Sequence, residues 1–151
     1  EDAKFLQHDG FDREGMQTAW EKNLKKGRIV AGGSTISQQL AKNLFLSGKR
    51  TPWRKGEEAI ITFMLEQMMS KRRIFEIYLN VIEWGDGVFG AEAAARHYFG
   101  KSASSLTPNQ AARLAAMVPN PRFYDKHRST RYLERRTRII QRRMNYVRPP
   151  R

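Results

Sequence analysis

The segment 32–43, GGSTISQQLAKN, places hydrogen-bonding side chains at a spacing that could hold a ligand. Thr35, Gln39 and Lys42 stand at positions i, i+4 and i+7, so in a helix they share one face. Their hydroxyl, amide and ammonium groups, together with the amide of Asn43, suit oxygen-rich ligands such as sugars and phosphates. The alternative is an ordinary solvated helix whose first turn is capped by a threonine hydroxyl.

The first twelve residues, EDAKFLQHDGFD, bring carboxylates next to aromatic rings and a histidine. A carboxylate such as Glu1 or Asp2, beside the apolar rings of Phe5 and Phe11, can serve as a proton acceptor near neutral pH. The alternative is an acidic turn that buries Phe5 in the core.

A second carboxylate with a basic neighbour lies in the stretch RKGEEAIITFMLEQMM. Arg54 and Glu58 are one helical turn apart, and Ile61 and Leu65 continue the same line with apolar side chains. A carboxylate at the edge of an apolar stripe, with an arginine nearby, is a candidate site residue. The alternative is a surface ion pair worth roughly a few tenths of a kcal/mol.

The stretch KRRIFEIYLN is typical of packing rather than chemistry. Ile74 and Tyr78 have core spacing, whereas Glu76 and Asn80 are polar. We therefore expect a structural helix in which Glu76 supports neighbouring elements through hydrogen bonds.

The composition sets limits on the chemistry. A chain of 151 residues is long enough for one domain with its own core. The absence of cysteine excludes disulfides and thiol catalysis, and no pair of the three histidines has the spacing of metal ligands.

The positive charge is concentrated at the end of the sequence. The formal net charge is +13, and residues 126–151 hold ten Lys and Arg against the single acid Glu134. Such a basic helix indicates an anionic partner, which could be a nucleic acid, phospholipid headgroups or a phosphorylated ligand. The alternative is a solvated terminal helix.

Helical periodicity and capping residues recur along the chain, whereas the alternation typical of strands is almost absent. We therefore predict one compact all-α domain of about seven helices joined by short loops. Thr51-Pro52 is predicted to begin the third helix, Pro119 and Pro121 to stop the sixth, and Pro149 to end the last. The predicted helices cover residues 13–26, 35–45, 52–69, 71–82, 91–99, 108–118 and 131–148.

Together these stretches resemble the ordered motifs of the peptidoglycan glycosyltransferases, a family of lysozyme-like transglycosylases. The motif E-D-x-x-F-x-x-H-x-G falls on Glu1, Asp2, Phe5, His8 and Gly10, and G-G-S-T-I-x-Q-Q-L-x-K-N falls on residues 32–43. The motif R-K-x-x-E falls on Arg54, Lys55 and Glu58, K-x-x-I-x-E-x-Y-L-N on residues 71–80, and a looser R-R-x-x-V-L on residues 135–140. The resemblance covers essentially the whole chain, and EWGDGVFGAEAAARHYFG and PNPRFYDKHR resemble the monofunctional proteobacterial branch.

The resemblance implies an all-α, lysozyme-like glycosyltransferase domain that polymerises lipid II. In that reaction the 4-hydroxyl of an acceptor sugar attacks the anomeric carbon of a lipid-linked glycan with inversion, and polyprenyl pyrophosphate leaves. The catalytic carboxylates by resemblance are Glu1, the general base, and Glu58, which positions the substrate or a divalent cation. No obligatory cofactor or resident metal is expected, although Mg²⁺ or Mn²⁺ could accompany the pyrophosphate.

The remaining motif residues take two kinds of role by resemblance. The residues implied to bind substrate are Asp2, Phe5, His8, Thr35, Gln39, Lys42, Asn43, Arg54 and Lys55. The residues implied to be structural are Glu76, Tyr78 and Asn80.

The implied location is the bacterial inner membrane, with the catalytic domain on the periplasmic side. The expected partners are lipid II, the growing lipid-linked glycan, the bilayer and other cell-wall synthesis or division proteins, with no nucleic acid. Because the chain begins inside a motif, we expect residues 1–151 to be a fragment of this domain, preceded by the start of the domain and a membrane anchor. The apolar side chains expected to touch lipid are Ile29, Val30, Ala31, Phe45, Leu46 and Trp53.

Two other functions remain open from the residues alone. A lysozyme-like peptidoglycan hydrolase would also use carboxylates on an all-α fold, but the cluster of Lys42, Arg54 and Lys55 would then have no pyrophosphate to bind. A basic helical module that binds nucleic acid would explain the C-terminal charge, but not the acidic first motif.

Overall fold

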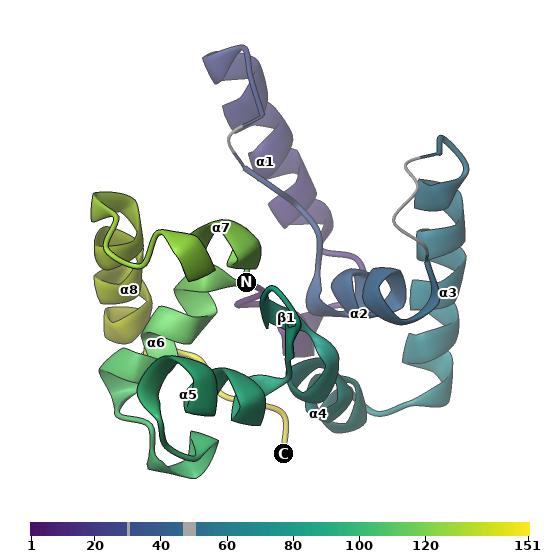
Figure 1. The fold of residues 1–151 in the computed structure, drawn as a ribbon. Coiled ribbons are helices and arrows are strands. Elements are labelled where there is room, and N and C mark those ends of the chain that lie inside the picture. Colours follow the sequence, from purple (N-terminus) through teal and green to yellow (C-terminus); the bar gives the residue numbers. More distant parts are fainter. Residues whose placement is uncertain (30, 47–50) are drawn as a thin grey trace. The chain divides into compact units, whose positions relative to one another are not determined.

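The computed structural model describes residues 1–29, 31–46 and 51–151 (Figure 1). These residues form eight α-helices, three short 3₁₀ helices and a single two-stranded hairpin, which confirms the prediction of an all-α fold. The chain divides into two compact units, each described by itself below. We call residues 2–75 the N-terminal unit, and Glu1 with residues 76–151 the C-terminal unit.

The N-terminal unit is built from a 3₁₀ turn and three helices, followed by the first turn of a fourth. The elements are η1 (Phe5–Gln7), α1 (Arg13–Lys26), α2 (Ile36–Phe45), α3 (Arg54–Met68) and the start of α4 (Lys71–Val81). Helix α2 packs against α3 (Figure 1). Leu40, Ala41 and Leu65 bury their side chains in this unit.

Local capping chemistry sets most of these helix boundaries. Asp12 accepts a hydrogen bond from the Gly15 amide at 2.9 Å and so begins α1, and Gly27 ends it in the left-handed conformation. Thr35 forms a full capping box at the start of α2, as the sequence predicts. The Ser70 hydroxyl accepts from the Arg73 amide at 3.2 Å and begins α4.

The prediction that α3 begins at Pro52, with Thr51 as its N-cap, is wrong. The helix begins at Arg54, and its N-cap, Trp53, makes no side-chain capping bond. The Thr51 carbonyl instead accepts from the Arg54 amide at 3.2 Å, which closes a turn with Pro52 inside it. Proline suits the second position of such a turn as well as it suits a helix start, so the dipeptide fits both structures.

The C-terminal unit contains the rest of α4, the hairpin and four further helices. Its elements after α4 are β1 (Glu83–Gly85), β2 (Val88–Phe89), α5 (Ala91–Phe99), η2 (Ala103–Ser105), α6 (Pro108–Met117), α7 (Pro121–Lys126), α8 (Arg131–Arg143) and η3 (Met144–Tyr146). Helices α6 and α8 pack together, and Leu114, Met117 and Leu133 are buried there. The buried Trp84 donates its indole N–H to the Leu114 carbonyl at 2.9 Å.

The sixth predicted helix, α6, ends at Met117, before Pro119 and Pro121, as predicted. The predicted helices do not include α7, in which Pro121 occupies the first position, where its missing N–H costs nothing. The predicted end of the last helix at Pro149 is wrong. Helix α8 ends at Arg143, well before Pro149, and passes into the 3₁₀ turn η3.

In the described parts of the chain, no helix is long and apolar enough to cross a membrane.

Candidate active site

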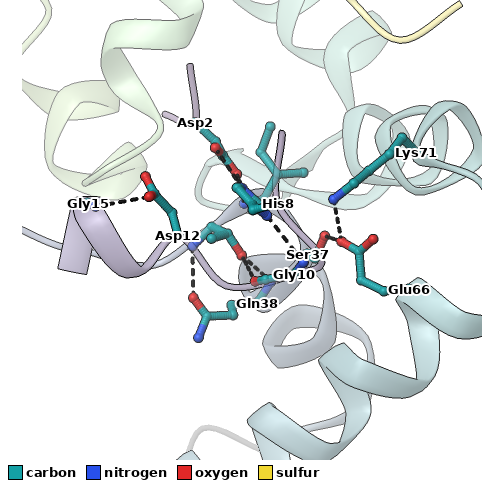
Figure 2. A network of polar contacts seen from close by, with 11 residues as sticks. Asp2, His8, Gly10, Asp12, Gly15, Ser37, Gln38, Glu66 and Lys71 are labelled. Carbon is teal, nitrogen blue, oxygen red and sulfur yellow. Dashed lines mark hydrogen bonds and ion pairs between the residues drawn. The ribbon is translucent and has the colours of Figure 1, made fainter. Parts of the chain in front are cut away.

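Asp2 lies at the centre of a polar network in the N-terminal unit (Figure 2). Its carboxylate is 2% exposed and accepts from His8 Nε2 at 2.9 Å and from the Ile36 amide at 3.1 Å. Ile36 is the first residue of α2, where backbone amides lack partners within the helix and the helix dipole favours a negative charge. The first motif is therefore anchored to the start of the second.

The protonation of His8 follows from its two ring nitrogens. Nδ1 accepts a hydrogen bond from the Gly10 amide at 3.2 Å, so this nitrogen carries no proton. Nε2 must then carry the ring proton and donate it to Asp2, which makes the imidazole the neutral tautomer. His8 thus orients the Asp2 carboxylate by a neutral hydrogen bond rather than by an ion pair.

Thr35 and Gly10 connect the first motif to α2 and α3. The Thr35 hydroxyl donates to the Gly10 carbonyl at 2.6 Å and accepts from the Gln38 amide at 3.2 Å. Gly10 has φ = 90°, and a Cβ at this position would come within 2.8 Å of the Thr62 side chain. Glycine is therefore required here, both for its backbone conformation and for the close approach to α3.

A second buried carboxylate, Glu66, was not singled out from the sequence. It accepts from the Ser37 hydroxyl at 2.5 Å and from Lys71 Nζ at 2.7 Å, and its side chain is only 6% exposed (Figure 2). Lys71 Nζ also lies 4.5 Å from the centre of the Phe5 ring, a cation–π distance. One signal in the sequence could have identified Glu66: it is a single acid at the end of the apolar run of α3. A charge among apolar residues is costly unless it is paired, so such an acid indicates a buried partner.

Glu58, the predicted second carboxylate, lies near the start of α3 and is also buried. Its Oε1 accepts from Lys55 Nζ at 2.6 Å, and the Lys55 side chain is largely exposed. The Glu58 carbonyl accepts from the Thr62 hydroxyl at 2.7 Å. The structure thus brings two residues of the third motif together, with the carboxylate inside and the cation at the surface.

A pocket of about 230 Å³ opens in the N-terminal unit beside Lys55. Met16 and Trp20 of α1 line one side, and Gln38 of α2 lines another. The Asn23 side chain makes two hydrogen bonds with the backbone of Ala31, of 2.9 and 3.0 Å. These bonds fix the backbone of Ala31, which forms another wall of the pocket. The pocket combines an apolar wall with amide and ammonium donors, which suits a ligand that is part apolar and part anionic.

The comparisons with known proteins agree with these motifs. The profile of the family described as Transglycosylase matches residues 1–145. The chain belongs to the transglycosylase family. The match includes every motif residue of the site described above, in both units.

Curated relatives in this family are similar along nearly the whole chain. A biosynthetic peptidoglycan transglycosylase of Laribacter hongkongensis is 78% identical over 150 residues, which cover 99% of this chain and 66% of the relative. Proteins of the same name from Methylobacillus flagellatus and Chromobacterium violaceum are 75% and 71% identical, with the same coverage. The chain thus spans just under two thirds of the length of these relatives.

Only some of the motif residues in the N-terminal unit contact one another directly. Thr35 is buried as a helix cap, Gln39 is half-buried, and Lys42 and Asn43 are exposed on α2. Arg54 is half-buried at the first position of α3. The substrate-binding roles of these residues stay predictions.

The other transglycosylase residues lie in the C-terminal unit. Glu1 is exposed, Tyr78 is buried in α4, and Asn80 donates to the Glu76 carbonyl at 2.8 Å. A Cβ on Gly90 would meet the Asn80 carbonyl oxygen at 2.7 Å, so this end of α4 packs closely on the chain that leaves the hairpin. The structural role of the fourth motif stays a prediction.

Proposed function

We propose that this chain carries the catalytic part of a peptidoglycan glycosyltransferase that polymerises lipid II. The acceptor 4-hydroxyl attacks the anomeric carbon of the lipid-linked donor and transfers its proton to Glu1. The bond between that carbon and the pyrophosphate oxygen breaks, the anomeric configuration inverts, and polyprenyl pyrophosphate departs. The relatives' name, biosynthetic peptidoglycan transglycosylase, favours synthesis over the hydrolysis that a lysozyme-like enzyme would perform.

The observation that carries this proposal is the anchoring of Asp2. Its buried carboxylate is fixed by His8 and by the first amide of α2, and Asp2 directly follows Glu1 in the chain. Adjacent Cα atoms are about 3.8 Å apart, so an immobile Asp2 limits the positions open to the proposed base. Preorganisation of this kind is what general-base catalysis requires.

The departing pyrophosphate requires cations and hydrogen-bond donors. Lys55 is one candidate to bind the pyrophosphate, because it lines the pocket and pairs with Glu58. Lys42 and Arg54 are the other cations that fall on the family motifs. A divalent cation could share this role, because Mg²⁺ needs only one or two carboxylates in addition to phosphate oxygens. Glu58, whose Oε1 accepts from Lys55 Nζ, would be the carboxylate beside such a cation. The described residues contain no group of three or more acids and histidines that could hold a metal by themselves.

Replacing Lys42 by Ala should lower kcat about tenfold, because an exposed cation that stabilises the developing charge contributes a modest share of the barrier. The KM for lipid II should change less, since the charge on the leaving group grows in the transition state. Initial rates on lipid II give both constants. Lys22→Ala on α1, also exposed, is the matched control, and an unchanged kcat for Lys42→Ala would remove this residue from the site.

The proposal places the protein in the cell envelope, with this domain on the periplasmic surface of the inner membrane. The N-terminal unit supports membrane contact, because Ile29, Trp53 and Phe45 expose 90%, 81% and 59% of their surface. Ala31 is half-buried and held by Asn23, and the predicted lipid contact at Val30 lies outside the described residues. Exposed apolar side chains of this size are typical of membrane or protein interfaces.

The double substitution Ile29→Ser and Trp53→Ser should weaken binding to phospholipid vesicles at least about tenfold. Burying each of these apolar side chains in the membrane would contribute roughly 1.5–3 kcal/mol to the binding free energy. Co-sedimentation of the protein with phospholipid vesicles, after removal of any membrane-anchoring segment, measures the effect. Phe89→Ser, at an exposed aromatic of the hairpin, serves as the control. Equal binding of the double variant and the wild type would exclude these two residues from the membrane contact.

One experiment tests the proposed function directly. The full-length protein is incubated with lipid II, and the products are sized by gel electrophoresis. Glycan strands many disaccharides long, formed together with polyprenyl pyrophosphate, are expected. Unchanged lipid II, or shortening of preformed strands by the same protein, would contradict the proposal.

A further inference from the structure

Helix α8 carries four arginines in a row along one side. Arg131, Arg135, Arg138 and Arg142 stand at i, i+4, i+7 and i+11, which places them within about 60° of one another around the helix axis. We call these four residues the arginine row. The row spans about 16 Å along the helix.

The opposite side of α8 is already occupied. Leu133 and Thr137 are buried there, and α8 packs against α6 through that side. The Thr137 hydroxyl donates to the Leu133 carbonyl at 2.8 Å, so the buried side has no unsatisfied polar group. The helix is thus held by its apolar side, and the arginine row faces away from α6.

The arginine row is exposed and has no acidic partner in the part of the chain that the structure describes. Within residues 1–29, 31–46 and 51–151, no ion pair or side-chain hydrogen bond engages any of the four guanidinium groups. Arg128, just before α8, differs because it donates to Asp125 at 2.9 Å, and Arg122 pairs with Glu83. Helix α6 has no acid, and Glu134 is the single acid of α8.

This arrangement costs stability in the isolated chain. Like charges one turn apart on a helix repel, and the row contains three such neighbouring pairs. Repulsion that is kept along a whole helix side indicates a ligand whose negative charges offset it. The ligand should be elongated, with anionic groups that recur along its length.

We propose that the arginine row binds the peptide carboxylates of the glycan strand that the proposed function produces; the inference therefore rests on that function. A peptidoglycan strand carries a short peptide on its repeating unit, and each peptide ends in carboxylate groups. The planar guanidinium group matches a carboxylate with two parallel hydrogen bonds, which a lysine cannot form. A linear series of carboxylates would thus meet a linear series of matching donors.

A phospholipid surface is the competing anionic ligand. A helix that lies on a bilayer normally inserts an apolar side among the lipid headgroups. The apolar side of α8 is buried against α6, so only its charges could contact a membrane. The geometry therefore favours a soluble strand over a lipid surface.

The test uses the full-length protein and peptidoglycan strands that were prepared beforehand by another enzyme and left uncrosslinked. Strand binding is measured by fluorescence anisotropy at low salt for the wild type and for Arg135→Gln/Arg138→Gln. The variant should bind about tenfold more weakly, as expected for the loss of two exposed charge pairs. Arg143→Gln/Arg148→Gln removes the same charge outside the row and should change binding less than about twofold.

Two further ligands identify the group that is bound. Strands whose peptides have been removed by an amidase should bind the wild type and the row variant equally weakly. Vesicles containing phosphatidylglycerol should bind both proteins equally. The proposal is overturned if the row variant binds intact strands like the wild type, if stripped strands still distinguish the two proteins, or if the difference appears only with vesicles.

The outcome is separable from that of the proposed function. Because the strands are made beforehand, binding does not require this protein to be active. A wild type that makes no polymer from lipid II would contradict the proposed function, whereas an active wild type whose strand binding ignores the arginine row would contradict only this inference.

Discussion

Glu1→Gln should abolish polymerisation of lipid II while leaving the helical fold intact. Glutamine keeps the size of the side chain but cannot accept a proton from the sugar hydroxyl at neutral pH. The loss of a general base typically lowers the rate by about 10²–10⁴-fold. Glu1 is exposed, so the neutral amide needs no burial and the free energy of unfolding should change little. Initial rates on lipid II, with circular dichroism of the same samples, measure both effects.

The control for this substitution lies in the same segment. Asp9 is an exposed carboxylate eight residues later, and Asp9→Asn removes the same charge at a position where the motif does not specify a residue. It should keep a rate within about twofold of the wild type, since surface substitutions away from a site have small effects. If Glu1→Gln retained a comparable rate, Glu1 would not be the base, and another carboxylate would have to accept the proton.

The sequence predicts best those features that depend on near neighbours in the chain. The predicted ranges 13–26 and 35–45 agree with α1 and α2 because the ends of both helices depend on local capping. Asp12 and Thr35 each accept from an amide three residues later, and Gly27 ends α1 in the left-handed conformation. The same local logic identified Ile74 and Tyr78 as buried. Such features need no knowledge of the tertiary fold.

Two elements that the sequence analysis does not predict, α7 and the hairpin, begin or turn at residues that fit more than one local structure. Pro121 both follows α6 and begins α7, because a proline can end one helix and still suit the first turn of another. The hairpin of β1 and β2 is marked by Asp86-Gly87, a strong hairpin signal that periodicity alone does not detect in such short strands. Gly87 has φ = 74°, as a turn of this kind requires.

The polar network of the candidate site was harder to predict, because it joins residues far apart in the chain. The bond from Thr35 to Gly10 spans 25 residues, and that from Ser37 to Glu66 spans 29. Thr35 looked like a ligand-binding residue from its place on a helix side, but its hydroxyl already makes two hydrogen bonds within the N-terminal unit. Only a structure shows which polar groups have satisfied one another.

Lys71→Met should cause the largest loss of stability among single substitutions in the N-terminal unit's network. It leaves the Glu66 carboxylate, 6% exposed, with the Ser37 hydroxyl but without its cation, and it also removes the contact of Nζ with the Phe5 ring. Removing one partner of a buried ion pair typically costs 3–5 kcal/mol, so we expect a loss of about 3 kcal/mol, since Lys71 is partly exposed. Hydrogen exchange of the α2 and α3 amides, with urea unfolding of the whole protein, measures it.

A second substitution tests whether the loss comes from the stranded charge. Glu66→Gln combined with Lys71→Met replaces the ion pair by neutral groups, and the glutamine oxygen can still accept from the Ser37 hydroxyl. The double variant should therefore be more stable than Lys71→Met alone, which a double-mutant cycle expresses as a favourable coupling of the pair. Lys22→Met, at an exposed lysine of α1, controls for the loss of positive charge and should change stability by less than about 0.5 kcal/mol. A Lys71→Met variant as stable as this control would show that the Glu66 carboxylate does not depend on Lys71.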